Sequence, residues 1–121
     1  MPKSKQLTEH FNFDELKCPC CGVLQLDQPF VKLMEKVRRD YGKPMVVNSF
    51  YRCDSHNREL GARSTSSHRL GLACDVKCDA SGDRYLLVRC LLKYFSRLGL
   101  GENFIHFDCD PDKMSGIWTY Y

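Results

Sequence analysis

Two histidine–carboxylate pairs contain the residue types most able to do chemistry in this chain. His68 and Asp75 lie in one segment with Gly71 between them, and His106 and Asp108 follow later in the chain. Two imidazoles and one carboxylate from separate segments are typical of a catalytic zinc ion, which keeps its fourth position open for water. The pattern therefore predicts a metal site formed by His68, Asp75 and His106.

Each pair also has a simpler interpretation. His68 could cap a turn and Asp75 could be an ordinary surface residue, but residues 72–76 have the pattern of an apolar strand. A carboxylate in such a strand is costly unless it is paired or bound to a metal. His106 on its own would more simply be a core histidine bonded to Asp108. The presence of both pairs in one short chain favours the metal site.

Three segments resemble, in the same order, the peptidase M15 family of zinc D-Ala-D-Ala carboxypeptidases. Residues 66–75 have its pattern Ser-x-His-x-x-Gly-x-Ala-x-Asp, and residues 104–108 are similar to its late His-x-Asp strand. Residues 48–53 resemble its Ser-Gly-Tyr-Arg segment, with Phe50 where the family has glycine. The resemblance extends over about residues 11–121, in particular to small phage-type and bacterial members.

This resemblance implies a zinc-dependent peptidase that hydrolyses a D-amino-acid-containing bond in peptidoglycan stem peptides. Such an enzyme is either a D-Ala-D-Ala carboxypeptidase or an endolysin-type endopeptidase. Arg52 resembles the family arginine that receives a carboxylate or carbonyl of the peptide, and Ser66 would bond the substrate or orient a ligand. The alternative is a non-catalytic, zinc-containing cell-wall-binding module of the same fold, since hedgehog signalling domains are related to these enzymes.

The residue that accepts a proton from the zinc-bound water is less obvious from the sequence. Several family members have an acidic residue three positions before the last ligand histidine, where this chain has Asn103. Asp108 and Glu102 are the nearest acids, and strand alternation places Asp108 on the same face as His106. We therefore predict Asp108 as the general base, with Glu102 as its alternative. If Asp108 is instead the third ligand, His106 becomes the helper.

Eight cysteines are many for a chain of this length. Cys18, Cys20 and Cys21 form a Cys-Pro-Cys-Cys-Gly turn that resembles a metal knuckle, but no partner pair follows at zinc-ribbon spacing. A fourth ligand would have to come from a distant position such as Cys53 or Cys109. Free thiols in a tight turn are the preferred interpretation, and a second, structural metal is the alternative.

Composition and charge restrict the partners. The chain has 121 residues and a net charge of +3, and its basic residues are spread along it, so nucleic acid binding is not expected. We expect a monomer whose partner is a peptidoglycan stem peptide. The polar start of the sequence has no signal-peptide pattern, and no segment predicts membrane insertion. These features predict synthesis in the cytoplasm and action on the cell wall after phage-type release or delivery.

The apolar pattern predicts one α+β domain over residues 1–121, in which a small, mostly antiparallel sheet packs against helices as in D-Ala-D-Ala peptidases and hedgehog domains. Residues 1–10 are expected to be loose. The pattern predicts helices at 29–41 and 81–98, a helical turn near 56–60, and strands at 45–49, 72–76, 104–109 and 117–121. Trp118, Tyr120 and Tyr121 are expected to close the core, and an aromatic wall for the substrate is the alternative.

Overall fold

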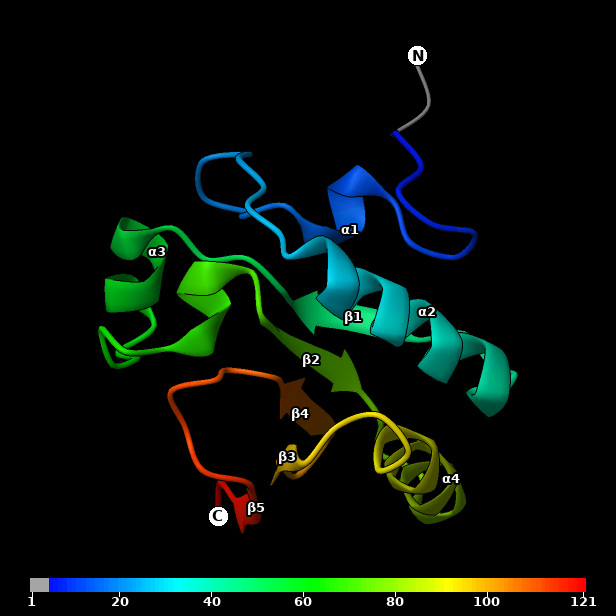
Figure 1. Cartoon of the computed structure of the whole chain (residues 1–121). Helices are drawn as coiled ribbons and strands as arrows, with labels where there is room; N and C mark the ends of the chain where they lie inside the picture. The colour runs from blue at the N-terminus through cyan, green and yellow to red at the C-terminus, as the bar shows by residue number, and fades with distance from the viewer. Residues whose placement is uncertain (1–4) are drawn as a thin grey trace.

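A five-stranded sheet forms the centre of the computed structural model, which describes residues 5–121 (Figure 1). The strand order is β1-β2-β4-β3-β5, and all neighbours are antiparallel except β3 and β5. The strands are β1 Val46–Ser49, β2 Ala73–Lys77, β3 Arg97–Leu100, β4 Phe104–Asp108 and β5 Gly116–Thr119. The predicted α+β class with a mostly antiparallel sheet is confirmed.

Within the described residues, four α-helices and one short 3-10 helix connect these strands. They are α1 Phe13–Leu16, α2 Gln28–Tyr41, α3 Asp54–Glu59, α4 Ser81–Leu91 and the 3-10 helix η1 Ser67–Leu70. The prediction for α2 is confirmed: the Asp27 side chain accepts from the Phe30 backbone N at 3.0 Å, and Gly42 ends the helix at φ 73°. None of these helices combines the length and apolar character needed to cross a membrane.

The predicted helix over residues 81–98 is wrong in its second half. Helix α4 ends at Leu91, and Arg97–Leu100 forms β3 instead. The N-cap of α4 is Ala80, which makes no side-chain capping hydrogen bond. The apolar spacing of this segment fits a strand as well as a helix. In the structure Leu98 is fully buried and pairs with Phe107 of β4. Hydrogen bonding to β4 on one side and β5 on the other outweighs the local helical pattern.

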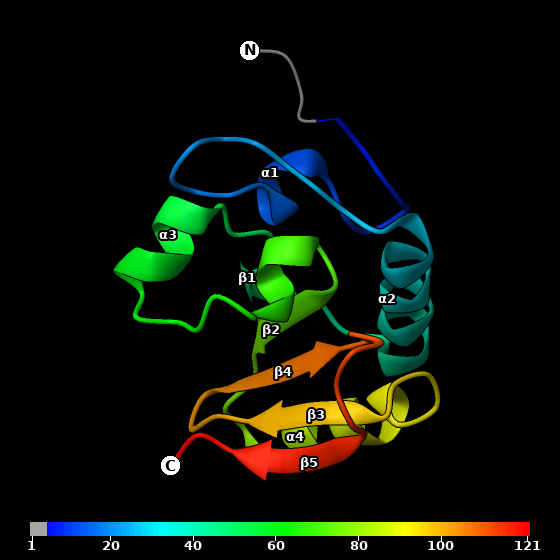
Figure 2. The same ribbon diagram turned by 60° about the vertical axis from the view of Figure 1, so that its left-hand side comes forward.

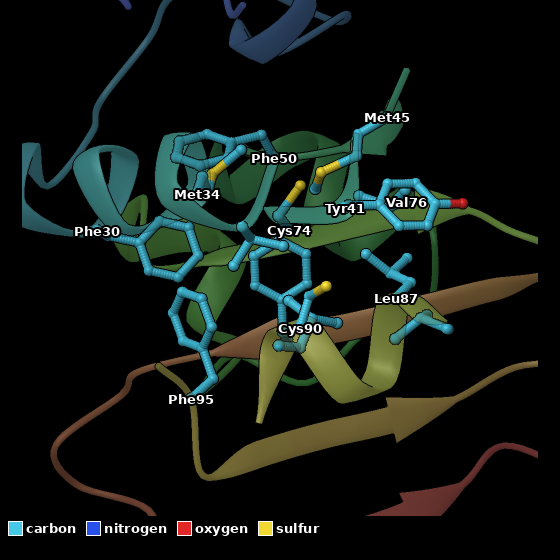
Figure 3. Close-up of a cluster of buried hydrophobic side chains, with 14 of the residues drawn as sticks. Phe30, Met34, Tyr41, Met45, Phe50, Cys74, Val76, Leu87, Cys90 and Phe95 are labelled. Carbon is cyan, nitrogen blue, oxygen red and sulfur yellow. The ribbon is translucent and has the colours of Figure 1, made fainter. Parts of the chain in front are cut away.

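The core lies between the sheet and the helices α2 and α4, and Figure 3 shows several of its side chains. Phe30 of α2 stacks on Phe107 of β4 with ring centroids 5.8 Å apart. Cys74 and Val76 of β2 are buried in the same cluster. Since side chains alternate along a strand, the residues between these core positions project from the opposite face of the sheet.

Residues 5–10 contact the body of the molecule through α2. His10 Nδ1 lies 2.6 Å from Glu35 Oε2, and the backbone N of His10 donates to Glu35 Oε1 at 2.7 Å. The expectation of a loose segment over residues 1–10 falls partly on residues 1–4, which lie outside the described residues.

Candidate metal centre and its cavity

Three elements bring three metal-binding side chains together on the face of the sheet opposite α2 and α4. Asp75 of β2 and His106 of β4 are direct partners in the strand register, and His68 projects from η1. Asp75 Oδ1 lies 2.8 Å from His106 Nδ1 and 3.3 Å from His68 Nε2. One donor atom from each residue lies within 4.8 Å of the other two, so a single ion could contact all three.

The local conformation of η1 places His68 over β2. The Ser66 side chain caps η1 by accepting from the His68 backbone N at 3.3 Å. Gly71 ends it with φ 68°, and a Cβ at this position would lie 2.2 Å from the carbonyl O of Gln25. Both the backbone conformation and the close approach therefore require glycine here.

Each imidazole is oriented by an acceptor on its outer nitrogen. His68 Nδ1 lies 2.7 Å from the carbonyl O of Phe50, which can only accept, so this nitrogen carries the proton and Nε2 presents its lone pair to Asp75. His106 Nε2 lies 2.7 Å from Asp108 Oδ2, and its Nδ1 faces Asp75. Such contacts are typical of metal-binding histidines. The donor set therefore fits a zinc ion, which would accept the lone pairs of the two inner nitrogens and of the Asp75 carboxylate.

The electrostatics favour the metal-binding forms of two donors. Burial alone would raise the pKa of Asp75, but contacts with His106 and His68 hold that pKa well below its usual range. Burial lowers the pKa of His68, so its neutral form predominates at neutral pH. Burial alone would also lower the pKa of His106, but Asp108 and Asp75 outweigh it and raise the pKa. As pH falls and His106 becomes protonated, a metal ion must displace that proton in order to bind.

The three donors lie in the wall of a cavity of about 650 Å³. Arg52 and Ser66 also line it, as do further basic residues: Arg63, Arg97 and Lys113. Arg52 Nη2 lies 3.4 Å from Asp75 Oδ2, and its Nε donates to Ser49 Oγ at 3.0 Å. The arrangement offers positive charge to an anionic or carbonyl-rich ligand beside the metal-binding side chains.

The sequence profile of the peptidase M15 family matches residues 9–108, which contain all three donors. The chain belongs to the peptidase M15 family. The match confirms the resemblance that the three motifs predicted. Members of this family are generally zinc-dependent metallopeptidases. A search of curated proteins found no match.

In this M15 peptidase, the two candidate bases occupy very different positions. Asp108 is 1% exposed, and both of its oxygens are engaged: Oδ1 accepts from Arg97 Nε at 2.6 Å, and Oδ2 contacts His106. Burial alone would raise the pKa of Asp108, but contacts with His106 and Arg97 lower it. Glu102 is exposed in the turn between β3 and β4, and is not among the residues that line the cavity. The identity of the base stays a prediction.

The expectation that Trp118 and Tyr120 close the core is wrong. They line the cavity, and the Trp118 ring centroid lies 5.6 Å from that of His106. They pack over Gly99, where a Cβ would meet both rings at 2.6 to 2.9 Å. Sequence reasoning also missed Arg97, whose guanidinium carbon lies 4.7 Å from the Trp118 ring centroid. The sequence pattern predicted a helix over residues 81–98. In the strand that forms there instead, Arg97 alternates with the core residue Leu98 and therefore faces the cavity.

Proposed function

We propose that this M15 peptidase hydrolyses a D-amino-acid-containing bond in peptidoglycan stem peptides. The main support is the convergence of His68, Asp75 and His106 in the wall of a cavity lined by basic side chains. Stem peptides carry carboxylates, and a cavity with several cations matches that charge. When bound, zinc would polarise the scissile carbonyl and lower the pKa of a bound water.

Arg52 is proposed as the residue that binds the peptide. Its side chain is only 13% exposed, and contacts with Ser49 and Asp75 fix its direction. A fixed, planar guanidinium can bind a carboxylate through two parallel hydrogen bonds, which orients the substrate as well as attracting it. Ser66 contributes by capping η1 and so holding His68 in place.

Asp108 is proposed chiefly as a positioning residue for His106. It can accept a proton only by weakening its contact with His106 or Arg97, because each of its oxygens already faces one of them. As an ionised acceptor it holds the proton of His106 on Nε2 and keeps Nδ1 directed at Asp75. The earlier assignment of Asp108 as general base remains the alternative that a substitution can test.

A second candidate function is a non-catalytic module that binds cell-wall peptides. One observation favours it: the carboxylates in the cavity lining are Asp75 and Asp108, and both are paired. Asn103, at the position where several relatives have an acid, is exposed in the β3–β4 turn and cannot accept a proton. Without a proton acceptor, the site would bind peptide and metal but would not turn over.

The deciding experiment is digestion of stem peptides ending in D-Ala-D-Ala by the zinc-loaded protein, with and without a chelator. We expect hydrolysis that the chelator abolishes and that is lost in His68→Ala, while His56→Ala, a histidine outside the cavity lining, retains it. Mass spectrometry separates release of one alanine from internal cleavage. Zinc-dependent peptide binding without any cleavage would support the second candidate instead.

A further inference from the structure

A second group of possible ligands lies away from the cavity and consists of the thiols of Cys18, Cys21 and Cys53. Their sulfur atoms lie within 4.8 Å of one another. Cys18 and Cys21 belong to the turn after α1, and Cys53 is the N-cap of α3. Figures 1 and 2 show this turn beside the start of α3. The fold thus supplies the distant cysteine that the sequence pattern lacked.

The turn itself has the backbone contacts of a tight loop. The Cys18 backbone N donates to the Val23 carbonyl O at 2.8 Å, and the Gly22 backbone N donates to the Cys18 carbonyl O at 2.8 Å. Gly22 has φ 74°, a conformation that favours glycine. This geometry directs the Cys18 and Cys21 side chains to the same side of the loop, where Cys53 meets them.

Backbone N–H groups point at the sulfur atoms, as is expected around thiolates. The Cys53 backbone N lies 3.5 Å from Cys18 Sγ, and the His56 backbone N lies 3.4 Å from Cys53 Sγ. A thiolate stabilised in this way is the form that binds soft metal ions.

We propose that Cys18, Cys21 and Cys53 bind a structural zinc ion that is separate from the His68, Asp75 and His106 site. Three thiolates are a typical donor set for structural zinc, which takes four ligands. Cys20 is the candidate for the fourth ligand, because its thiol contacts that of Cys53 and is exposed. Cys109 is not in the group, so the earlier suggestion that it could supply a ligand has no support here.

The proposed ion would stabilise the segment that carries the peptide-binding arginine. Cys53 directly follows Arg52, whose backbone N donates to the His68 carbonyl O at 3.1 Å. The preceding Tyr51 backbone N donates to the Leu16 carbonyl O of α1 at 3.2 Å. An ion shared by Cys18 and Cys53 would therefore connect α1 to the chain beside the cavity. The argument for this ion does not depend on peptidase activity.

Metal content of the purified chain tests the proposal directly. We expect two zinc equivalents in the reduced wild type and one in the double variant C18S/C53S. The matched control is Cys109→Ser, a half-buried cysteine outside the group, which should retain two. The double variant H68A/D75A should also lose one equivalent, but a different one. Cobalt substitution distinguishes them, since thiolate-to-cobalt absorption should persist in H68A/D75A and vanish in C18S/C53S.

A second measurement avoids cysteine variants that fail to fold. A thiol-specific mercurial added to the folded wild type should release one zinc equivalent and leave the other bound. The proposal is overturned if the mercurial releases no zinc, or if C18S/C53S folds and keeps both equivalents. It is also overturned if mass spectrometry finds a disulfide among these cysteines in protein purified under reducing conditions. None of these results bears on whether stem peptides are cleaved.

Discussion

Arg97 of β3 and Asp108 of β4 form a partly buried ion pair directly across the strand register. Arg97 Nε donates to Asp108 Oδ1 at 2.6 Å, while Asp108 Oδ2 lies 2.7 Å from His106 Nε2. A guanidinium, a carboxylate and an imidazole thus lie in series, with the free nitrogen of the imidazole directed at Asp75. The orientation of His106, a candidate metal ligand, therefore depends on Arg97 through Asp108.

The substitution Asp108→Asn tests this relationship. An amide cannot accept from both Arg97 and His106, because one of its two terminal atoms is a donor. We expect a folded protein whose zinc affinity falls about 10- to 100-fold, as is typical when the partner of a metal-binding histidine is removed. Competition with a chromophoric chelator measures this affinity.

A general base would behave differently from a positioning residue. Loss of a base typically costs about 10²–10⁴ in rate without loss of the metal. Wild-type zinc affinity together with near-complete inactivity in Asp108→Asn would therefore assign Asp108 as the base. The control is Glu102→Gln, which we expect to leave both zinc affinity and activity unchanged, because Glu102 is exposed outside the cavity lining.

Glu35 gives the fold a pH-dependent contribution to stability. Burial alone would raise its pKa, but contacts with His10 outweigh it and lower the pKa below its usual value. A carboxylate with a depressed pKa stabilises the fold above its unfolded pKa of about 4.3, and that stability is lost as pH falls through the lower folded value. We expect Glu35→Gln to cost about 1.5–3 kcal/mol at pH 7.

Thermal unfolding at a series of pH values provides the measurement. The difference in Tm between wild type and Glu35→Gln should be largest near neutral pH and should shrink below about pH 4. Glu102→Gln, an exposed glutamate in the β3–β4 turn, should show no such difference at any pH. A Tm difference for Glu35→Gln that is independent of pH would show that the ionised carboxylate is not what stabilises this contact.

Much of the fold could be predicted because its signals are local. Helix α2 has a capping aspartate, an apolar stripe and a terminal glycine within a few residues of one another. Strand β3 could not be predicted in the same way, because Leu98 and its neighbours satisfy both a helical and an extended pattern. Its state depends on pairing with Phe107 and Ile117, which the sequence alone does not place beside it.

The candidate site also contains some features that the sequence could predict and others that it could not. His68, Asp75 and His106 could be predicted as one group because two histidine–carboxylate pairs occur in one short chain and their segments resemble the M15 family, and the structure brings their donor atoms within 4.8 Å of one another. The Phe50 carbonyl that orients His68 has no side-chain signature. The approach of Cys53 to the cysteine turn likewise depends on long-range packing, so the isolated motif seemed incomplete.

Gly71 is predicted to be essential for the placement of His68. In Gly71→Ala the new Cβ would lie 2.2 Å from the Gln25 carbonyl O, and the residue would also keep a left-handed conformation. The control Gly42→Ala has φ 73° but nothing within 4 Å of its Cβ. Its free energy of unfolding should therefore fall only by the cost of the left-handed conformation, about 1–2 kcal/mol. We expect a larger loss of unfolding free energy for Gly71→Ala, together with weaker zinc binding. Equal losses in chemical denaturation would contradict the steric argument.

Arg52→Lys separates peptide binding from metal binding. Lysine keeps the charge but loses the planar pair of donors, and its shorter reach cannot bond Ser49 and a substrate carboxylate together. We expect kcat/KM on stem peptides to fall about 10- to 100-fold, the equivalent of one hydrogen bond to a charged group, while zinc content stays at the wild-type level. Arg58→Lys on the exposed side of α3 is the matched control and should retain full activity. If kcat/KM for Arg52→Lys equals that of the control on every peptide that the wild type cleaves, Arg52 does not bind the substrate.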